Sequence, residues 1–181
     1  MSTARLAAAV AGAVLLVPMI SQAADVPAVK LTPKEIRAVD AFIMTQARAR
    51  RSKETPDRCV EDPDARRYLV GDVGHDGVAD IVVRYTLEQG NNWMLFLAVF
   101  TRPSMRFVAS ARVGGKGYRT VDLGEISNGV IELHTQNYAP NDPMCCPSVP
   151  GQSAYALVQG RLEEVELTID CSARKPPEQT E

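Results

Sequence analysis

The sequence lacks the excess of positive charge that nucleic-acid-binding proteins use. Its 181 residues include 20 lysines and arginines against 22 aspartates and glutamates, a net charge of -2. Because phosphate neutralisation requires a basic surface, this balance argues against general DNA or RNA binding. The 45% hydrophobic and 23% charged residues are ordinary for one globular domain, which excludes a disordered or collagen-like chain.

Long apolar runs are also missing, apart from one near the N-terminus. There Arg5 precedes the apolar stretch 6–17, and Ser21-Gln22-Ala23 supplies the small residues that precede a signal-peptidase cut. The stretch is shorter than the about 20 apolar residues that a membrane-spanning helix needs. We therefore expect residues 1–23 to be a secretory signal peptide and residues 24–171 a single domain. The protein is then periplasmic or secreted, without an integral membrane span.

Histidine is scarce, and this limits the enzymatic chemistry that the chain can perform. A relay in which histidine activates a nucleophile must use His75 or His134, because there are only these 2. His134 and Glu132 share a face of an expected strand, where they could form a general base or simply a solvated polar surface. No nucleophile motif accompanies them. We favour a non-enzymatic protein, with a small envelope hydrolase using His134 and Glu132 as the alternative.

The 4 cysteines are few but even in number, which in an exported protein favours disulfides. A bond between the adjacent Cys145 and Cys146 would close a strained ring. We therefore expect these two residues to bridge separately to Cys59 and Cys171, in an order that the sequence leaves open. A zinc or redox site is disfavoured because no Cys-x-x-Cys pair is present.

One amphipathic helix is predicted near the start of the exported chain. Thr32 can cap its N-terminus, Pro33 suits the first turn, and Glu35 can return a hydrogen bond to the cap. The helix is expected to run to about Arg51. Its apolar stripe at helical spacing consists of Ile36, Val39, Ile43 and Ala47.

After this helix the hydrophobic pattern changes to the period of two that is typical of strands. Strands are expected around residues 81–88, 93–100, 107–113, 118–123, 130–136, 154–158 and 162–169. The first of these alternates as a strand with one buried face does, whereas residues 93–100 are apolar on both faces, as in a central strand. Turn residues separate neighbouring strands, among them the type I′ pair Asn128-Gly129, and leave no room for crossover helices. The fold class is therefore α+β, with one N-terminal helix packed on a mainly antiparallel, disulfide-stapled meander. Residues 172–181 are expected to be a flexible tail.

An Asp-rich segment, Gly71-Asp72-Val73-Gly74-His75-Asp76-Gly77-Val78-Ala79-Asp80, immediately precedes the first long strand. Asp72, Asp76 and Asp80 occupy positions 1, 5 and 9 of a calcium-type loop, and Gly77 occupies position 6, where the chain must turn sharply. This spacing can aim several oxygens at one point. The equally weighted alternative is a metal-free turn whose carboxylates cap backbone N–H groups.

The segment resembles the Asp-rich calcium loops of FG-GAP and VCBS-type repeats. That resemblance implies side-chain ligands from Asp72, Asp76 and Asp80 and a backbone carbonyl ligand from Val78. Two positions depart from calcium-loop patterns: Gly74 replaces the Asn or Asp of position 3, and Val83 stands where an EF-hand has its bidentate Glu. Fewer oxygens lower the affinity, so any calcium binding should be weak, and no other cofactor is expected.

Several further segments are similar to those of a family of small exported bacterial proteins, which implies export and one domain but no activity. They are Tyr68-Leu69-Val70-Gly71-Asp72, Arg84-Tyr85-Thr86-Leu87-Glu88, Leu97-Ala98-Val99-Phe100, Val113-Gly114-Gly115-Lys116-Gly117 and Asp142-Pro143-Met144-Cys145-Cys146-Pro147-Ser148. The loop before the cysteine pair offers Tyr138, Asn141 and Asp142 as candidate contact residues. We predict a binding or interaction module whose partner is an envelope protein or a glycan.

Overall fold

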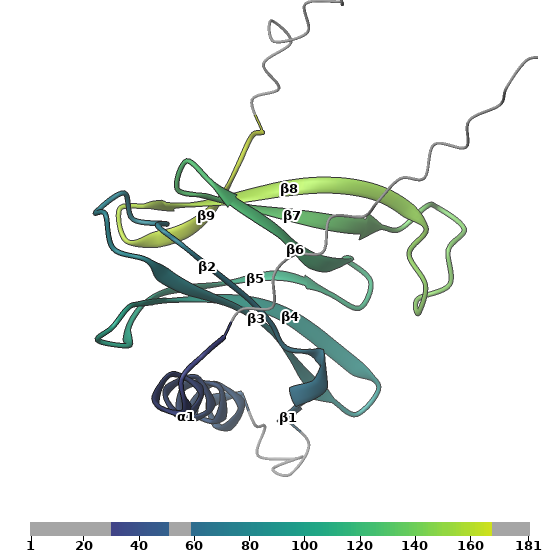
Figure 1. Cartoon of the computed structure of the whole chain (residues 1–181). Helices are drawn as coiled ribbons and strands as arrows, with labels where there is room; N and C mark the ends of the chain where they lie inside the picture. The colour runs from purple at the N-terminus through teal and green to yellow at the C-terminus, as the bar shows by residue number, and fades with distance from the viewer. Residues whose placement is uncertain (1–29, 51–58, 168–181) are drawn as a thin grey trace, which may run out of the picture.

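The computed structural model describes residues 30–50 and 59–167, which form one helix, a short 3-10 turn and one sheet (Figure 1). The predicted signal peptide, the predicted tail and Cys171 lie outside the described residues. The helix α1 spans Pro33–Ala49, and η1 spans Pro63–Ala65. The strands are β1 (Cys59–Glu61), β2 (Arg67–Gly71), β3 (Asp80–Gln89), β4 (Asn92–Thr101), β5 (Arg106–Gly115), β6 (Arg119–Ser127), β7 (Val130–Asn137), β8 (Val149–Val158) and β9 (Arg161–Val165).

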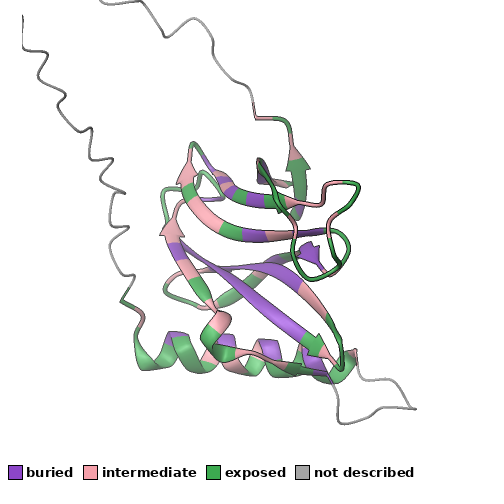
Figure 2. Ribbon diagram, turned by 90° about the vertical axis from the view of Figure 1, so that its right-hand side faces the viewer, coloured by how far each residue is buried: buried purple, intermediate pink, exposed green. Residues whose placement is uncertain are grey.

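The predicted helix is confirmed, together with its capping box. The Thr32 hydroxyl accepts a hydrogen bond from the Glu35 N–H, and the Glu35 carboxylate accepts one from the Thr32 N–H at 2.7 Å. Val39, Ile43 and Ala47 are buried as expected, and the helix turns this face towards the sheet (Figure 2).

The expectation for Ile36 is wrong, because its side chain is 41% exposed and Glu35 is buried in its place. The physical reason is an ion pair. Glu35 accepts hydrogen bonds from Nε and Nη2 of Arg102 at 2.5 and 2.9 Å, and these hold its side chain in the buried position.

From β3 to β9 the sheet is the predicted antiparallel meander, with each strand paired to the next. The sequence did not reveal β1 and β2, which are short and pair with the same edge of β3. β1 pairs with the stretch 87–89 and β2 with the stretch 80–84. β3 is therefore enclosed by β4 on one edge and by two short strands on the other.

The sheet bends sharply between β5 and β6, which share the single residue pair Gly115 and Arg119. Strands β6–β9 consequently fold over β2–β5, so that β2 contacts β6 and β5 contacts β9. Figure 1 shows the resulting three layers, with α1 below, β2–β5 in the middle and β6–β9 above.

Two hydrophobic cores fill the spaces between these layers. The helix–sheet core lies between α1 and the middle layer and contains Val39, Ile43, Val83, Tyr85 and Phe100, among others. The inter-sheet core lies between the two strand layers and contains Val82, Leu97, Val99, Leu133 and Tyr155, among others.

The expectation that β3 buries only one face is wrong: Ile81 to Leu87 are buried on both faces (Figure 2). The helix covers one face and the folded-over strands cover the other. For β4, the expected burial of both faces is confirmed. Among the described residues, no helix is long and apolar enough to cross a membrane.

Candidate functional site

The loop between β2 and β3, residues 72–79, is held by its own aspartates. Asp72 accepts hydrogen bonds from the backbone N–H groups of Asp76 at 3.2 Å and Gly77 at 3.0 Å. Asp76 accepts one from the N–H of Val78 at 2.9 Å. Gly77 has a φ of 77°, a left-handed conformation that glycine adopts without strain. These hydrogen bonds are those of a carboxylate-capped turn.

Asp80 ties the end of this loop to the core. Its side chain accepts a hydrogen bond from the Val73 N–H at 3.1 Å, and Val73 itself packs in the inter-sheet core. Asp80 is only 3% exposed. Burial raises the pKa of Asp80, and hydrogen bonds from the N–H groups of Val73 and Gly74 and from the Thr101 side chain oppose that rise.

Over the described residues, no group of three or more acidic, histidine or cysteine side chains is arranged to hold a metal ion. Gly74 occupies the position where the repeats carry Asn or Asp. A Cβ placed on it would lie 3.9 Å from Asp80 Oδ2 and 4.0 Å from Asp76 Cγ, so an added carboxylate would enter beside both. Calcium binding by Asp72, Asp76, Val78 and Asp80 stays a prediction.

The predicted recognition loop, residues 138–148, connects β7 to β8 (Figure 1). The Asp142 carboxylate accepts hydrogen bonds from the Ala139 N–H at 2.8 Å, the Ser148 N–H at 2.8 Å and the Ser148 hydroxyl at 2.9 Å. These bonds, that from Ala139 foremost, lower the pKa of Asp142. Asp142 thereby fastens the two ends of the loop to each other.

Tyr138 fastens the middle of this loop to the turn between β5 and β6. Its hydroxyl donates a hydrogen bond to the Met144 carbonyl at 2.7 Å and accepts one from the Gly117 N–H at 3.3 Å. The polar groups of Tyr138 and Asp142 are therefore used in hydrogen bonds that hold the loop in its conformation. Of the three predicted contact residues, Asn141 is the one with an exposed side chain.

Cys145 and Cys146 form a disulfide with each other. The expectation that they bridge separately to Cys59 and Cys171 is therefore wrong. The physical reason is a tight turn, in which the Cys146 N–H donates a hydrogen bond to the Pro143 carbonyl at 2.9 Å and brings the neighbouring side chains together. Cys59 is buried in the helix–sheet core.

Exposed apolar side chains lie in the loop that carries this disulfide, at the start of β8 and in the β5–β6 turn. Met144 is 57% exposed, Tyr118 45% and Val149 44%. Met144 lies against the β5–β6 turn, because a Cβ on Gly117 would meet Met144 Cε at 2.9 Å. We call the group formed by Tyr118, Met144, Cys145, Cys146 and Val149 the loop patch.

His134 and Glu132 share the outer face of β7, as the sequence predicted, because the alternating Leu133 and Thr135 are buried. The register places Asp122 of β6 directly opposite His134 on one side and Gln152 of β8 on the other. The structure thus brings to His134 a carboxylate that the sequence reasoning did not single out. The order of strands in the sheet, which the sequence does not state, decides this pairing.

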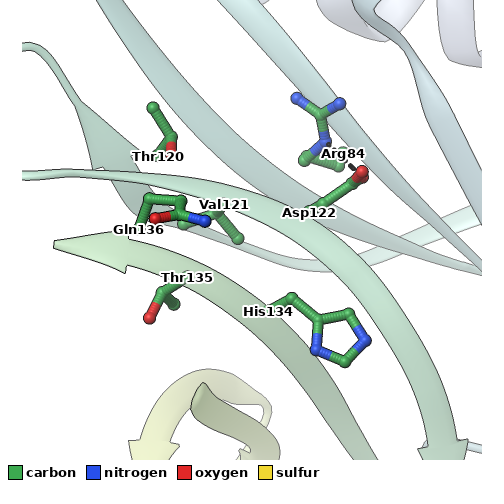
Figure 3. A pocket seen from close by; sticks show the side chains of 7 residues that line it. All are labelled: Arg84, Thr120, Val121, Asp122, His134, Thr135 and Gln136. Carbon is green, nitrogen blue, oxygen red and sulfur yellow. Dashed lines mark ion pairs between the residues drawn. The ribbon is translucent and has the colours of Figure 1, made fainter. Parts of the chain in front are cut away.

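Beside His134 lies a pocket with a volume of about 370 Å³, between β3, β6 and β7 (Figure 3). Its lining residues are Arg84, Thr120, Val121, Asp122, His134, Thr135 and Gln136. The lining contains two threonine hydroxyls but no serine or cysteine among the described residues. Figure 3 shows the Arg84 and Asp122 side chains approaching each other across the gap between the two strand layers.

Arg84 is the most unusual residue of this pocket. Its position in the most buried strand leaves it 8% exposed, and its Nε has no hydrogen-bond partner among the described residues. Sequence reasoning missed it as a site residue. No sequence signal indicated it, because the alternation of residues 81–88 puts Arg84 on the face that a strand with one buried face turns to solvent.

Comparisons of the chain with protein-family models, with curated proteins and with solved structures find no match.

Proposed function

We propose that the protein is an exported, non-enzymatic interaction module of the bacterial envelope, which acts in the periplasm or after secretion and binds a partner protein through the loop patch. The observation that carries the proposal is the contrast, within residues 138–148, between polar side chains that bond inside the protein and apolar side chains that are exposed. The polar groups of Tyr138 and Asp142 are used inside the loop. Met144 and its apolar neighbours are left on the surface.

This arrangement favours association for two physical reasons. A loop already fixed by hydrogen bonds loses little conformational entropy when it binds, so more of the contact energy remains as affinity. Exposed methionine, tyrosine and disulfide sulfur provide polarisable apolar surface, which is typical of the centre of a protein interface. A protein partner suits this patch better than a glycan, because a glycan needs several free hydrogen-bonding groups.

Site-specific photo-crosslinking in the exporting cell tests this proposal. A photoreactive residue at position 144 should yield a discrete crosslinked product, whereas the same residue at position 158 should not. Val158 is the matched control: it is apolar, 38% exposed and at the opposite end of β8 from the patch. Asp142→Ala, which releases the loop ends, should weaken the product at position 144 several-fold.

Equal crosslinking from positions 144 and 158 would contradict the proposal, and so would a product that Asp142→Ala leaves unchanged. Retention of the protein on isolated cell-wall glycan without any crosslink at position 144 would favour the glycan partner instead. The alternative hydrolase requires a turnover that His134→Ala abolishes without changing the melting temperature.

Weak calcium binding at residues 72–80 is a separate part of the proposed function. Only Asp80 of the three aspartates is buried, which leaves Asp76 in contact with solvent. Calcium that binds only the folded state raises the melting temperature according to its concentration and Kd. We expect millimolar calcium to raise the melting temperature relative to chelator, and Asp76→Ala to remove this rise.

Gly74→Asp gives this test a gain-of-function arm. The added carboxylate supplies the oxygen that the repeats have at position 3, so the rise caused by calcium should exceed that of the natural protein. Without calcium the same variant should be less stable, because the added carboxylate then repels those of Asp76 and Asp80. A rise in Gly74→Asp alone would contradict calcium binding by the natural loop, and differential scanning fluorimetry measures both.

A further inference from the structure

The arginines of this fold differ in how completely they are paired. Three of them hold a carboxylate with two nitrogens of the guanidinium: the pairs are Arg66 with Glu61, Arg102 with Glu35 and Arg119 with Glu164. Such bidentate pairing is the strongest that arginine makes with a carboxylate. Among the described arginines that form ion pairs, Arg84 is the exception, because its pair with Asp122 joins Nε and Oδ1 at 3.6 Å.

That distance is too long for a hydrogen bond, so Asp122 compensates the buried charge only in part. The side chain of Asp122 is 63% exposed and that of Arg84 10% exposed, which leaves one charge in water and the other in the protein. Asp122 Oδ1 also accepts a hydrogen bond from the Leu123 N–H at 2.9 Å. A buried cation without full pairing is costly, and a further anion would offset that cost.

The charges around Arg84 also favour the binding of an anion. Burial lowers the pKa of the Arg84 guanidinium, the Asp122 carboxylate opposes this, and the charge of Arg67 adds to the lowering. Arg67 is the residue paired with Arg84 between β2 and β3. Two arginines thus stand side by side against one carboxylate, a local excess of positive charge.

The remaining lining of the pocket supplies groups that can bind a polar ligand. Thr120, His134 and Gln136 line the same pocket as Arg84 and contribute a hydroxyl, an imidazole and an amide (Figure 3). At about 370 Å³, its volume admits a small organic molecule. The Arg84 pocket is separate from the loop patch, since the two share no residue.

We propose that the Arg84 pocket binds a small organic monocarboxylate that carries a hydroxyl or ammonium group next to its carboxylate. The Arg84 guanidinium holds the carboxylate, and Asp122 accepts a hydrogen bond from the neighbouring hydroxyl or ammonium. Asp122 also sets the charge of the ligand, because its carboxylate repels the second negative charge of a phosphate dianion. This ligand site goes beyond the proposed interaction with a partner protein and does not depend on it.

Nuclear magnetic resonance titration of the oxidised protein tests the ligand class with four probes: L-lactate, L-alanine, acetate and inorganic phosphate. Lactate and alanine should shift the Arg84 Nε–Hε resonance and the amides of residues 120–122 and 134–136 in a saturable way. Acetate lacks the donor for Asp122 and should bind about tenfold more weakly, which corresponds to about 1.4 kcal/mol. Phosphate should bind most weakly of the four.

Three results would overturn the proposal: no saturable shift at Arg84 with any probe, equal affinity for acetate and lactate, or tighter binding of phosphate than of lactate. Asp122→Ala provides an internal check, because the side chain is 63% exposed and its loss leaves no cavity, although the free energy of unfolding should fall as Arg84 loses this counter-charge. In this variant the preference for lactate over acetate should disappear and phosphate binding should strengthen.

Arg84→Met separates a binding role from a structural one. Methionine replaces the buried charge by an apolar side chain of similar length, so the ligand-free melting temperature should stay the same or rise while lactate binding disappears. Arg106→Met is the matched control, since Arg106 is an exposed strand arginine outside the pocket, and it should bind lactate normally. A marked loss of stability in Arg84→Met without ligand would overturn the proposal, because it would assign Arg84 a structural role.

Discussion

At the scale of single residues, the buried Glu35 shows how a charged side chain can be used for contacts inside the protein. Glu35 serves two functions at once: it completes the helix cap with Thr32 and it pairs with Arg102 of the β4–β5 turn. The sequence predicts the first function, because the cap is local. It cannot predict the second, because Arg102 lies 67 positions away along the chain.

The Glu35–Arg102 pair leads to a prediction about stability in acid. The hydrogen bonds from Arg102 hold the pKa of Glu35 at about 2, below its ordinary value of 4.5. A lowered pKa stabilises the fold above pH 4.5, and this contribution is lost as the pH falls from 4.5 towards 2. Glu35→Gln keeps a capping side chain but loses the charge, and should cost about 1 to 2 kcal/mol at neutral pH.

Urea unfolding of both proteins between pH 2 and pH 7 measures this difference. The gap in unfolding free energy should close as Glu35 becomes protonated. A gap of constant size over the whole range would show that the carboxylate charge does not stabilise the fold.

At the scale of elements, the turn between β6 and β7 is predicted by its own two residues and also contacts a loop that is distant in the sequence. Asn128 and Gly129 have φ values of 50° and 73°, the positive values that the predicted type I′ turn requires. The Asn128 carbonyl also lies 2.7 Å from Nε2 of His75. The turn therefore supports the Asp-rich loop, a contact that no local sequence pattern indicates.

A matched pair of glycine variants tests this contact. Gly129→Ala and Gly160→Ala both place alanine at a positive φ, 73° and 77°, which costs about 1 to 2 kcal/mol. A Cβ at Gly129 would also collide with the His75 ring, whereas the space at Gly160 is open. Gly129→Ala should therefore cost about 1 to 3 kcal/mol more than Gly160→Ala in thermal or urea unfolding. The excess should vanish in a His75→Ala background, and an equal cost for both single variants would contradict the contact.

At the scale of the whole molecule, β3 and β4 join the two cores into one structure. Alternate residues of each strand face the helix–sheet core and the inter-sheet core. Loss of packing in one core therefore also destabilises the other core, because both depend on the same two strands. We expect the helix and both strand layers to unfold together.

Two truncations, one in each core, test this cooperativity. Ile43→Ala empties space under the helix and Leu133→Ala empties space between the strand layers, each at a cost of about 2 to 5 kcal/mol. In both variants, helix circular dichroism and Trp93 fluorescence should change at the same temperature. Trp93 packs against the inter-sheet core and is the single tryptophan of the chain, so its fluorescence reports on that core. Loss of the helix signal at a lower temperature in Ile43→Ala would show that the helix melts separately.

The sequence by itself determined the elements whose causes are local. The helix cap, seven of the strands and the Asn128-Gly129 turn follow from neighbouring residues, because capping, periodicity and turn conformation act over a few positions. Only the tertiary structure decided how these elements cover one another. The fold of the sheet between β5 and β6 buries both faces of β3, and it thereby encloses Arg84.

The same distinction explains the site residues. Periodicity placed His134 and Glu132 on one strand face, but the register of β6 against β7 supplied Asp122 as the neighbour of His134. The strain expected for a bond between adjacent cysteines favoured separate bridges to Cys59 and Cys171, yet a tight turn joined Cys145 to Cys146. Contacts between strands and the path of a turn depend on the whole chain, because many distant residues share in the energy that selects them.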